Sequence, residues 1–104
     1  MIDIERLRFL NRPEQIAITE HARHRLMERG ISVNDIRRCI DTGEVIMQYE
    51  DDKPFPSCLV LGMSVNGRYI HVVVSCNEEW IYLITAYQPD PAVWEPDLKT
   101  RKER

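Results

Sequence analysis

One helix-forming stretch carries basic side chains at a spacing that could hold an anion. His21, Arg25 and Arg29 recur at every fourth position of a segment that begins after Thr19, so on a helix they form one line beside its apolar side. A guanidinium at such a border can bind a phosphate or a carboxylate through paired hydrogen bonds. We therefore predict half of a site here. The structural alternative is that Arg29 only stabilises the helix C-terminus and that His21 bonds to a loop.

A second histidine, His71, interrupts a β-branched segment, where an imidazole is costly unless it is hydrogen-bonded or exposed. The preceding Asn66-Gly67 predicts a two-residue hairpin turn. That register places His71 opposite Gly62 on the smaller, more polar face, where the missing side chain leaves space above a shallow surface. Helices should cover the other face, which carries Leu59, Leu61, Met63, Ile70, Val72 and Val74. A histidine that is merely satisfied within its strand is the alternative.

If His21 and His71 converge, one imidazole can act as base and the other as acid, while Arg25 or Arg29 holds a phosphate. This is the chemistry of a metal-free ribonuclease. Two histidines without a further Cys or carboxylate at ligand spacing argue weakly for zinc, so we expect no metal and no cofactor. Tyr87 ends the last predicted strand and is the fifth candidate catalytic residue, after the two histidines and the two arginines. A three-residue loop before that strand puts it on the His71 face, and a two-residue loop on the helix face.

The elements that must position these residues follow from caps and periodicity. Short helices are predicted at 3–10, from Thr19 to the Gly30 stop, and from Ser32 to Gly43. Strands follow at 44–50, 58–65, 68–76 and 80–87. The expected fold is α+β, with two or three N-terminal helices packed on one face of a four-stranded antiparallel sheet. We divide this single domain of 104 residues into an N-terminal segment 1–17, a core 18–87 and a Pro-rich, charged tail 88–104, which Trp94 pins to the body.

The composition narrows the class of protein. A net charge of −3 argues against a globally basic nucleic-acid binder and leaves only local basic patches. No apolar run approaches the roughly 18 residues that span a membrane, and the N-terminus lacks the apolar region of a secretory signal, so we expect a cytoplasmic protein without membrane contact. Cys39, Cys58 and Cys76 are odd in number and widely spaced, which predicts buried, reduced thiols.

Four segments together resemble the bacterial and archaeal domain-of-unknown-function family 4258. They are HARHRLMERGISVNDI, GEVIMQYEDDKPFPSCLVLG, NGRYIHVVVS and ITAYQPDPAVW. The family's motif positions fall here at His21, Arg25, Arg29, Gly30, Pro56, Gly62, His71, Tyr87, Pro89 and Trp94. The resemblance implies an architecture similar to small toxins of the RelE and BrnT type, which often cleave RNA. It also implies a partner similar to the zinc-ribbon antitoxins of the YgiT/MqsA type.

Two functions are therefore open. The first is a toxin-like component of a bacterial or archaeal toxin–antitoxin system that acts as an endoribonuclease through His21, Arg25, Arg29, His71 and Tyr87. The second is a non-enzymatic module that binds protein or nucleic acid, in which the same residues and the tail serve recognition. The acidic net charge departs from the basic surface that RNA-cleaving toxins usually carry.

Overall fold

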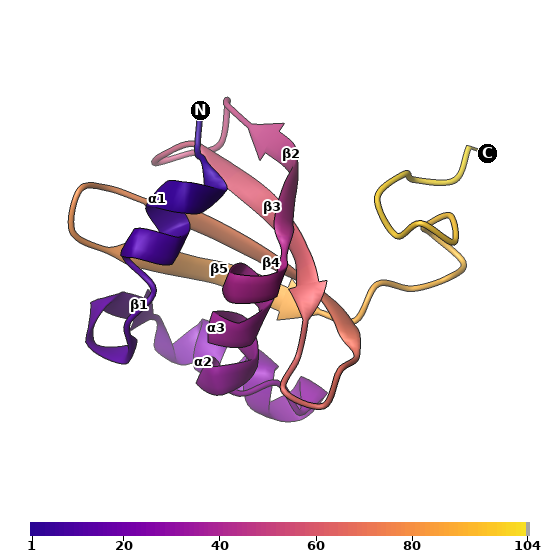
Figure 1. Cartoon of the computed structure of the whole chain (residues 1–104), viewed down its shortest axis with the longest axis horizontal. Coiled ribbons are helices and arrows are strands. Elements are labelled where there is room, and N and C mark those ends of the chain that lie inside the picture. Colours follow the sequence, from indigo (N-terminus) through magenta and orange to yellow (C-terminus); the bar gives the residue numbers. More distant parts are fainter. Residues whose placement is uncertain (104) are drawn as a thin grey trace.

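A computed structural model describes residues 1–103, in which three α-helices lie on one side of a five-stranded sheet (Figure 1). In chain order the elements are α1 (Ile4–Phe9), the 3₁₀ turn η1 (Pro13–Gln15), β1 (Ile16–Ile18), α2 (Glu20–Arg29), α3 (Val33–Thr42), β2 (Glu44–Tyr49), β3 (Ser57–Met63), β4 (Tyr69–Cys76) and β5 (Ile81–Tyr87). The strand order across the sheet is β1-β5-β4-β3-β2. None of the described helices is long and apolar enough to cross a membrane.

The predicted α+β class with helices on one face is confirmed, but the four-stranded antiparallel sheet is wrong by one strand. β1 pairs in parallel with β5, with Ile16 opposite Ile81 and Ile18 opposite Leu83. Three residues are too few to show the alternation that marks a strand. Their partner also lies at the far end of the chain, so this pairing is decided by tertiary contact.

Local capping positions the two longer helices as predicted. The Thr19 hydroxyl accepts a hydrogen bond from the backbone N–H of Ala22, and Gly30 ends α2 in the left-handed region at φ 66°. At the start of α3, Ser32 and Asp35 form a complete capping box, each side chain accepting from the other residue's backbone N–H. These caps are formed between residues that are close in sequence, so the sequence predicts them without knowledge of the tertiary fold.

The β3–β4 hairpin does not have the predicted register. The Ser64 carbonyl accepts from the Gly67 N–H at 2.9 Å, and the Ser64 N–H donates to the Arg68 carbonyl at 2.7 Å. Gly67 lies at φ 79°. This is a three-residue loop, a turn followed by a left-handed glycine, instead of the two-residue turn that Asn66-Gly67 predicts. The change slips the pairing by one residue, so His71 lies opposite Leu61 and not Gly62.

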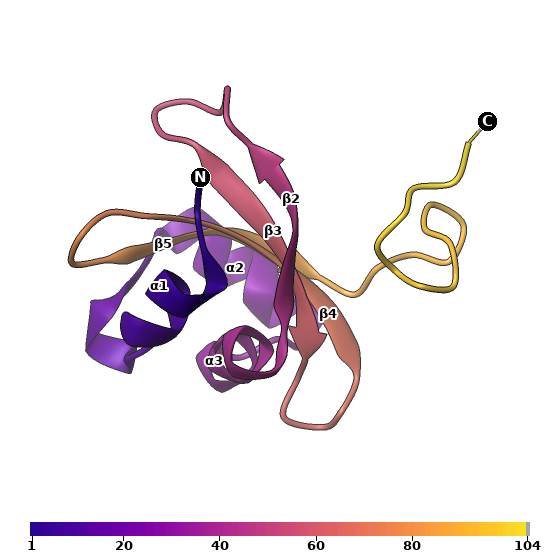
Figure 2. The same cartoon turned by 45° about the horizontal axis from the view of Figure 1, so that its top comes forward.

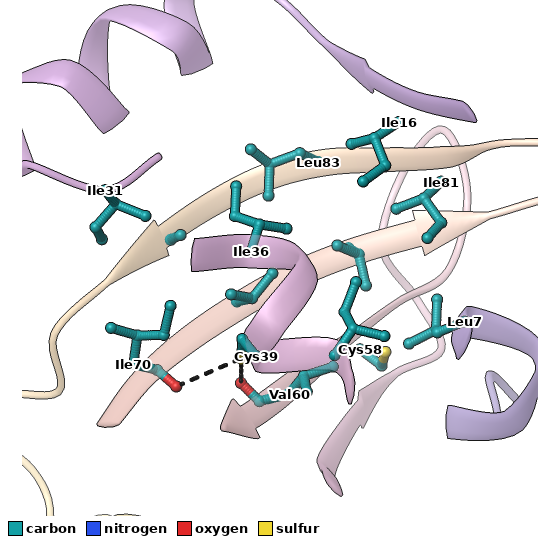
Figure 3. Close-up of a cluster of buried hydrophobic side chains, with 14 of the residues drawn as sticks. Leu7, Ile16, Ile31, Ile36, Cys39, Cys58, Val60, Ile70, Ile81 and Leu83 are labelled. Atoms are coloured by element: carbon teal, nitrogen blue, oxygen red, sulfur yellow. Dashed lines mark hydrogen bonds between the residues drawn. The ribbon is translucent and has the colours of Figure 1, made fainter. Parts of the chain in front are cut away.

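The slip exchanges the two faces of β3. Ile70, Val72 and Val74 lie under the helices as predicted, but their β3 companions are Cys58 and Val60. The core cluster under the helices also receives Leu7 of α1, Leu26 of α2 and Ile36 of α3. Figure 3 shows Leu7 and Ile36 among the side chains of this cluster. Leu59 and Leu61, expected on the helix face, are absent from this cluster and instead lie on the opposite face of the sheet, with His71.

Buried thiols contribute to the core under the helices. Cys39 of α3 lies between the carbonyls of Val60 and Ile70, with its Sγ 3.9 Å and 3.8 Å from the two oxygens (Figure 3). Burial raises the pKa of Cys39 to about 12 and that of Cys58 to about 12. Both are therefore protonated and unreactive near neutral pH. The prediction of unpaired thiols is confirmed for all three cysteines, although Cys76 is only half-buried.

Gly62 allows α3 to approach the sheet closely, which gives a stability prediction. A Cβ on Gly62 would overlap the backbone carbonyl of Cys39, and backbone cannot rotate out of the way. We expect Gly62→Ala to lower the free energy of unfolding by about 1–3 kcal/mol, measured by urea denaturation. Val65→Ala is the control, because Val65 is 61% exposed on the same hairpin. Equal midpoints for the two variants would contradict the close packing.

The face of the sheet opposite the helices is covered by the C-terminal tail, 88–103. Figures 1 and 2 show the tail leaving β5 and looping on that side. It folds back on itself: the Glu95 N–H donates to Thr100 O, and the Lys102 N–H donates to Val93 O, each at 2.8 Å. Trp94 is only 5% exposed, so the prediction that it pins the tail is confirmed. Leu59, Leu61 and His71 are buried on this face.

Candidate functional site

His71 is enclosed on the tail-covered face. Its ring centroid lies 5.3 Å from that of Tyr87 and 4.5 Å from that of Trp94, both in edge-to-face geometry. The side chain is 0% exposed, so the prediction of a shallow surface above Gly62 is wrong. The cause is the register slip, which replaces the open space above a glycine with Leu61, together with the tail, which closes over the ring.

The hydrogen bonds of His71 determine where its proton lies. Nε2 is 2.8 Å from the Leu98 carbonyl oxygen, which can only accept, so Nε2 carries the proton. Nδ1 then has a free lone pair, and the Tyr87 hydroxyl, 3.4 Å away, donates to it. Burial lowers the pKa of His71, and the Leu98 carbonyl partly opposes this effect. The ring is therefore neutral near pH 7, with the lone pair of Nδ1 directed at the Tyr87 hydroxyl.

This lowered pKa links the stability of the protein to pH. Below the ordinary value of 6.5, the unfolded chain binds more protons at His71 than the folded chain does. The contribution of the neutral ring is therefore complete above about pH 6.5 and is lost as the pH falls toward the lowered pKa. We expect a drop in urea midpoint between about pH 7.5 and about pH 5.5, and a smaller drop in His71→Gln. Identical drops in the two proteins would contradict this linkage.

Tyr87 lies on the same face as His71 and directly opposite it. The β4–β5 turn pairs Cys76 with Ile81, a register that, if continued, would place Tyr87 opposite Ile70 under the helices. A bulge between Val73 and Val74 inserts one residue of β5 and returns Tyr87 to His71. Burial first, and then Tyr49, raise the pKa of Tyr87, while Arg101 and Arg29 lower it. The positive charges of these two arginines favour the ionised form of its hydroxyl.

Arg29 connects α2 to this cluster. Its Nη1 donates to the Thr85 hydroxyl at 3.0 Å and to the Ala86 carbonyl at 2.9 Å. The pairing with β1 ends at Leu83, so this part of β5 is an open edge that the guanidinium can reach. These two bonds use only Nη1, so the Arg29 guanidinium keeps N–H donors on its other nitrogens for an anion. Arg29 therefore does more than stabilise the helix terminus.

His21 and Arg25 stand apart from this cluster. Both are exposed on α2, and no hydrogen bond or ion pair in the described residues joins either to His71 or Tyr87. Since both ring nitrogens of His71 are already engaged inside the fold, a direct proton exchange between the two histidines has no geometric support. The structure brings together Arg29, His71 and Tyr87, and leaves His21 and Arg25 along the outer surface of the same helix.

Two further residues belong to the cluster and were missed from the sequence. Leu98 acts through its backbone carbonyl, which no side-chain pattern reveals, and Arg101 lies with its guanidinium carbon 5.5 Å from the Trp94 ring centroid. The one sign in the sequence that the tail contacts the body was Trp94, an aromatic residue within a polar tail. Within residues 1–103, no group of three His, Cys, Asp or Glu side chains could hold a metal ion. The chemistry that these residues offer is proton transfer beside an anion-binding cation.

Of the comparisons with known proteins, only the family model gives a match, and it includes most of the candidate site. No curated protein matches the chain, and no solved structure does. A family model described as Domain of unknown function (DUF4258) matches residues 18–88, a span that includes α2, Arg29, His71 and Tyr87 and ends at the first residue of the tail. Because the match covers more than half of the chain, the protein belongs to this family of domains of unknown function.

Proposed function

We propose that the protein is the toxin-like component of a toxin–antitoxin pair and cleaves RNA in the cytoplasm without a metal ion. The observation that carries this proposal is the hydrogen-bonded Tyr87–His71 pair, together with the Arg29 guanidinium, which is held on the two residues before Tyr87 in β5. Three elements, α2, β4 and β5, supply these groups. His21 and Arg25 serve in the same proposal as surface contacts for the RNA backbone, because both are exposed along α2.

The arrangement fits transesterification by the ribose 2′-hydroxyl. The half-buried Tyr87 oxygen takes the proton of the 2′-hydroxyl while its own proton passes along the existing hydrogen bond to the unprotonated Nδ1 of His71. The 2′-oxygen forms a bond to phosphorus, and the bond from phosphorus to the 5′-oxygen breaks. The proton then returns through Tyr87 to the leaving 5′-oxygen, so both side chains end as they began. Arg29 stabilises the added negative charge on the phosphate oxygens.

Cleavage by the purified protein is the direct test. We expect the full chain to cut single-stranded RNA in excess chelator and to leave a 2′,3′-cyclic phosphate, because the 2′-oxygen is the nucleophile. Arg29→Gln should cut more slowly, and His24→Gln, exposed on the same helix, should cut at the wild-type rate. RNA that stays intact with every form would refute the enzymatic proposal.

Supporting points come from the wider fold. The RelE-like architecture implied by the resemblance is a fold-level analogy that does not transfer an activity by itself, although helices on one face of antiparallel strands agree with it. The three unpaired cysteines suit a reducing cytoplasm. For the zinc-ribbon antitoxin partner, we expect affinity capture from the native cell to recover a zinc-containing protein. Capture without bound zinc would contradict this partner class.

One observation favours the non-enzymatic alternative. His71 is fully buried, whereas Arg23 and Arg25 are exposed on α2 and form no ion pair within residues 1–103. Such cations can contact an RNA backbone or an acidic protein without any reaction. In that case Arg25→Gln weakens binding, His71→Gln leaves it unchanged, and the bound RNA remains uncut.

A further inference from the structure

The backbone of Leu98 has an unusual conformation in the tail. Its φ of 61° is the one left-handed value for a residue other than glycine within 1–103. A side chain disfavours this region, so the surrounding bonds must impose it. The Leu98 N–H donates to the Glu95 carbonyl at 2.8 Å. The Asp97 carboxylate then accepts from the Lys99 N–H at 2.9 Å and the Thr100 N–H at 3.0 Å, which closes the turn from the other side.

The same turn is attached to the body at three points. Trp94 packs against His71, the Lys99 ammonium pairs with the Glu44 carboxylate of β2 at 2.5 Å, and the Leu98 carbonyl accepts from His71 Nε2 at 2.8 Å. The left-handed turn is thus the part of the tail that directs a carbonyl at the imidazole. Backbone strain next to a candidate proton acceptor is a feature that points to function.

We propose that Leu98 is a positioning residue: its carbonyl holds His71 with Nε2 protonated and Nδ1 free to accept from Tyr87, so the tail completes the site. This proposal rests on the proposed ribonuclease function. The family model ends at residue 88, so the comparisons assign no role to this turn. A neutral imidazole needs such an orienting partner, because the opposite tautomer presents an N–H where the reaction requires a lone pair.

A tail that merely covers His71 would behave in the opposite way. If the tail had to move aside for RNA to reach the ring, weakening it would speed cleavage. If the tail orients the ring, weakening it slows cleavage. The direction of the change in rate therefore separates a positioning segment from a cover.

Two substitutions of Leu98 in the full chain test the proposal. Leu98→Gly keeps the carbonyl and accepts the left-handed backbone, whereas Leu98→Pro cannot adopt a positive φ. The tautomer of His71 is measured from its ring nitrogen NMR shifts, assigned by their loss in His71→Gln. We expect wild type and Leu98→Gly to keep Nε2–H, and Leu98→Pro to show a mixture of tautomers. The kcat of RNA cleavage should fall at least about tenfold in Leu98→Pro, with KM unchanged.

The following results would overturn the proposal. It is overturned if wild-type His71 carries its proton on Nδ1, if Leu98→Pro keeps the wild-type tautomer and rate, or if Leu98→Pro cleaves faster. Loss of rate in Leu98→Gly equal to that in Leu98→Pro also overturns it, because side-chain packing would then explain both. If no form cleaves RNA but the tautomer shifts as expected, the ribonuclease function fails and the control of His71 by Leu98 stands.

Discussion

Tyr87→Phe should slow RNA cleavage by about 10²- to 10⁴-fold while the fold is retained. Phenylalanine keeps the ring that packs edge-to-face against His71 at 5.3 Å, but it removes the hydroxyl that donates to Nδ1. With no oxygen between the ribose and the buried imidazole, the proton has no path to His71. The measurement is single-turnover cleavage of a short RNA with protein in excess, so that product release does not affect the rate.

Tyr69→Phe is the matched control for Tyr87→Phe. Tyr69 begins the same strand that carries His71, but it is 53% exposed, and its hydroxyl makes no hydrogen bond within the described residues. We expect the wild-type rate. Thermal unfolding of both variants establishes that any loss of rate is not a loss of fold. If both variants cleave like wild type, Tyr87 is not in the proton path and the non-enzymatic alternative gains support.

Trp94→Ala should lower the free energy of unfolding by about 3–5 kcal/mol, the usual cost of removing a large aromatic side chain from a packed interior. Trp94 packs against His71 and helps to cover a face on which Leu59 and Leu61 are buried. The measurement is equilibrium denaturation in urea, with the slope compared with that of wild type. A smaller slope would show that the tail has already detached in the folded variant.

Trp80→Ala separates this effect from the general loss of a tryptophan. Trp80 lies at the β4–β5 turn, is 38% exposed, and covers no buried histidine, so we expect a loss of about 1 kcal/mol or less. Equal losses in the two variants would mean that the tail contributes no more than a surface turn. Such a result would also weaken the argument that the tail holds His71.

The register of β3 against β4 could not be predicted from the sequence of the turn alone. Asn66-Gly67 correctly predicted a turn, but a glycine in the left-handed region can close either a two-residue or a three-residue loop. The two loops differ by one residue, and strand side chains alternate, so this small difference exchanged the faces of Leu59 and Leu61. Packing against α3 favours the three-residue loop, because that register places Gly62 under the Cys39 carbonyl, where any Cβ would overlap the oxygen.

The face of the sheet on which Tyr87 lies also could not be predicted from local sequence patterns. Neither predicted loop alone describes it, because the turn and a bulge farther along β5 act together. Bulges leave little trace in sequence, since the extra residue can be of almost any type. Tyr87 and His71 could be identified as candidates by residue type, whereas their contact depends on this irregularity.

The stretch from Thr19 to Ser32 contains, in sequence alone, the caps of two helices and the line of His21, Arg25 and Arg29. These features depend on hydrogen bonds between near neighbours, and they are present as predicted. The site depends on contacts between distant segments. Only the tertiary structure decided that Arg29 reaches β5, that His71 faces Tyr87, and that Leu98 of the tail bonds to His71 Nε2. The reason is that strand register, bulges and backbone carbonyls are set by packing across the whole sheet, whereas a helix cap is set within a single turn.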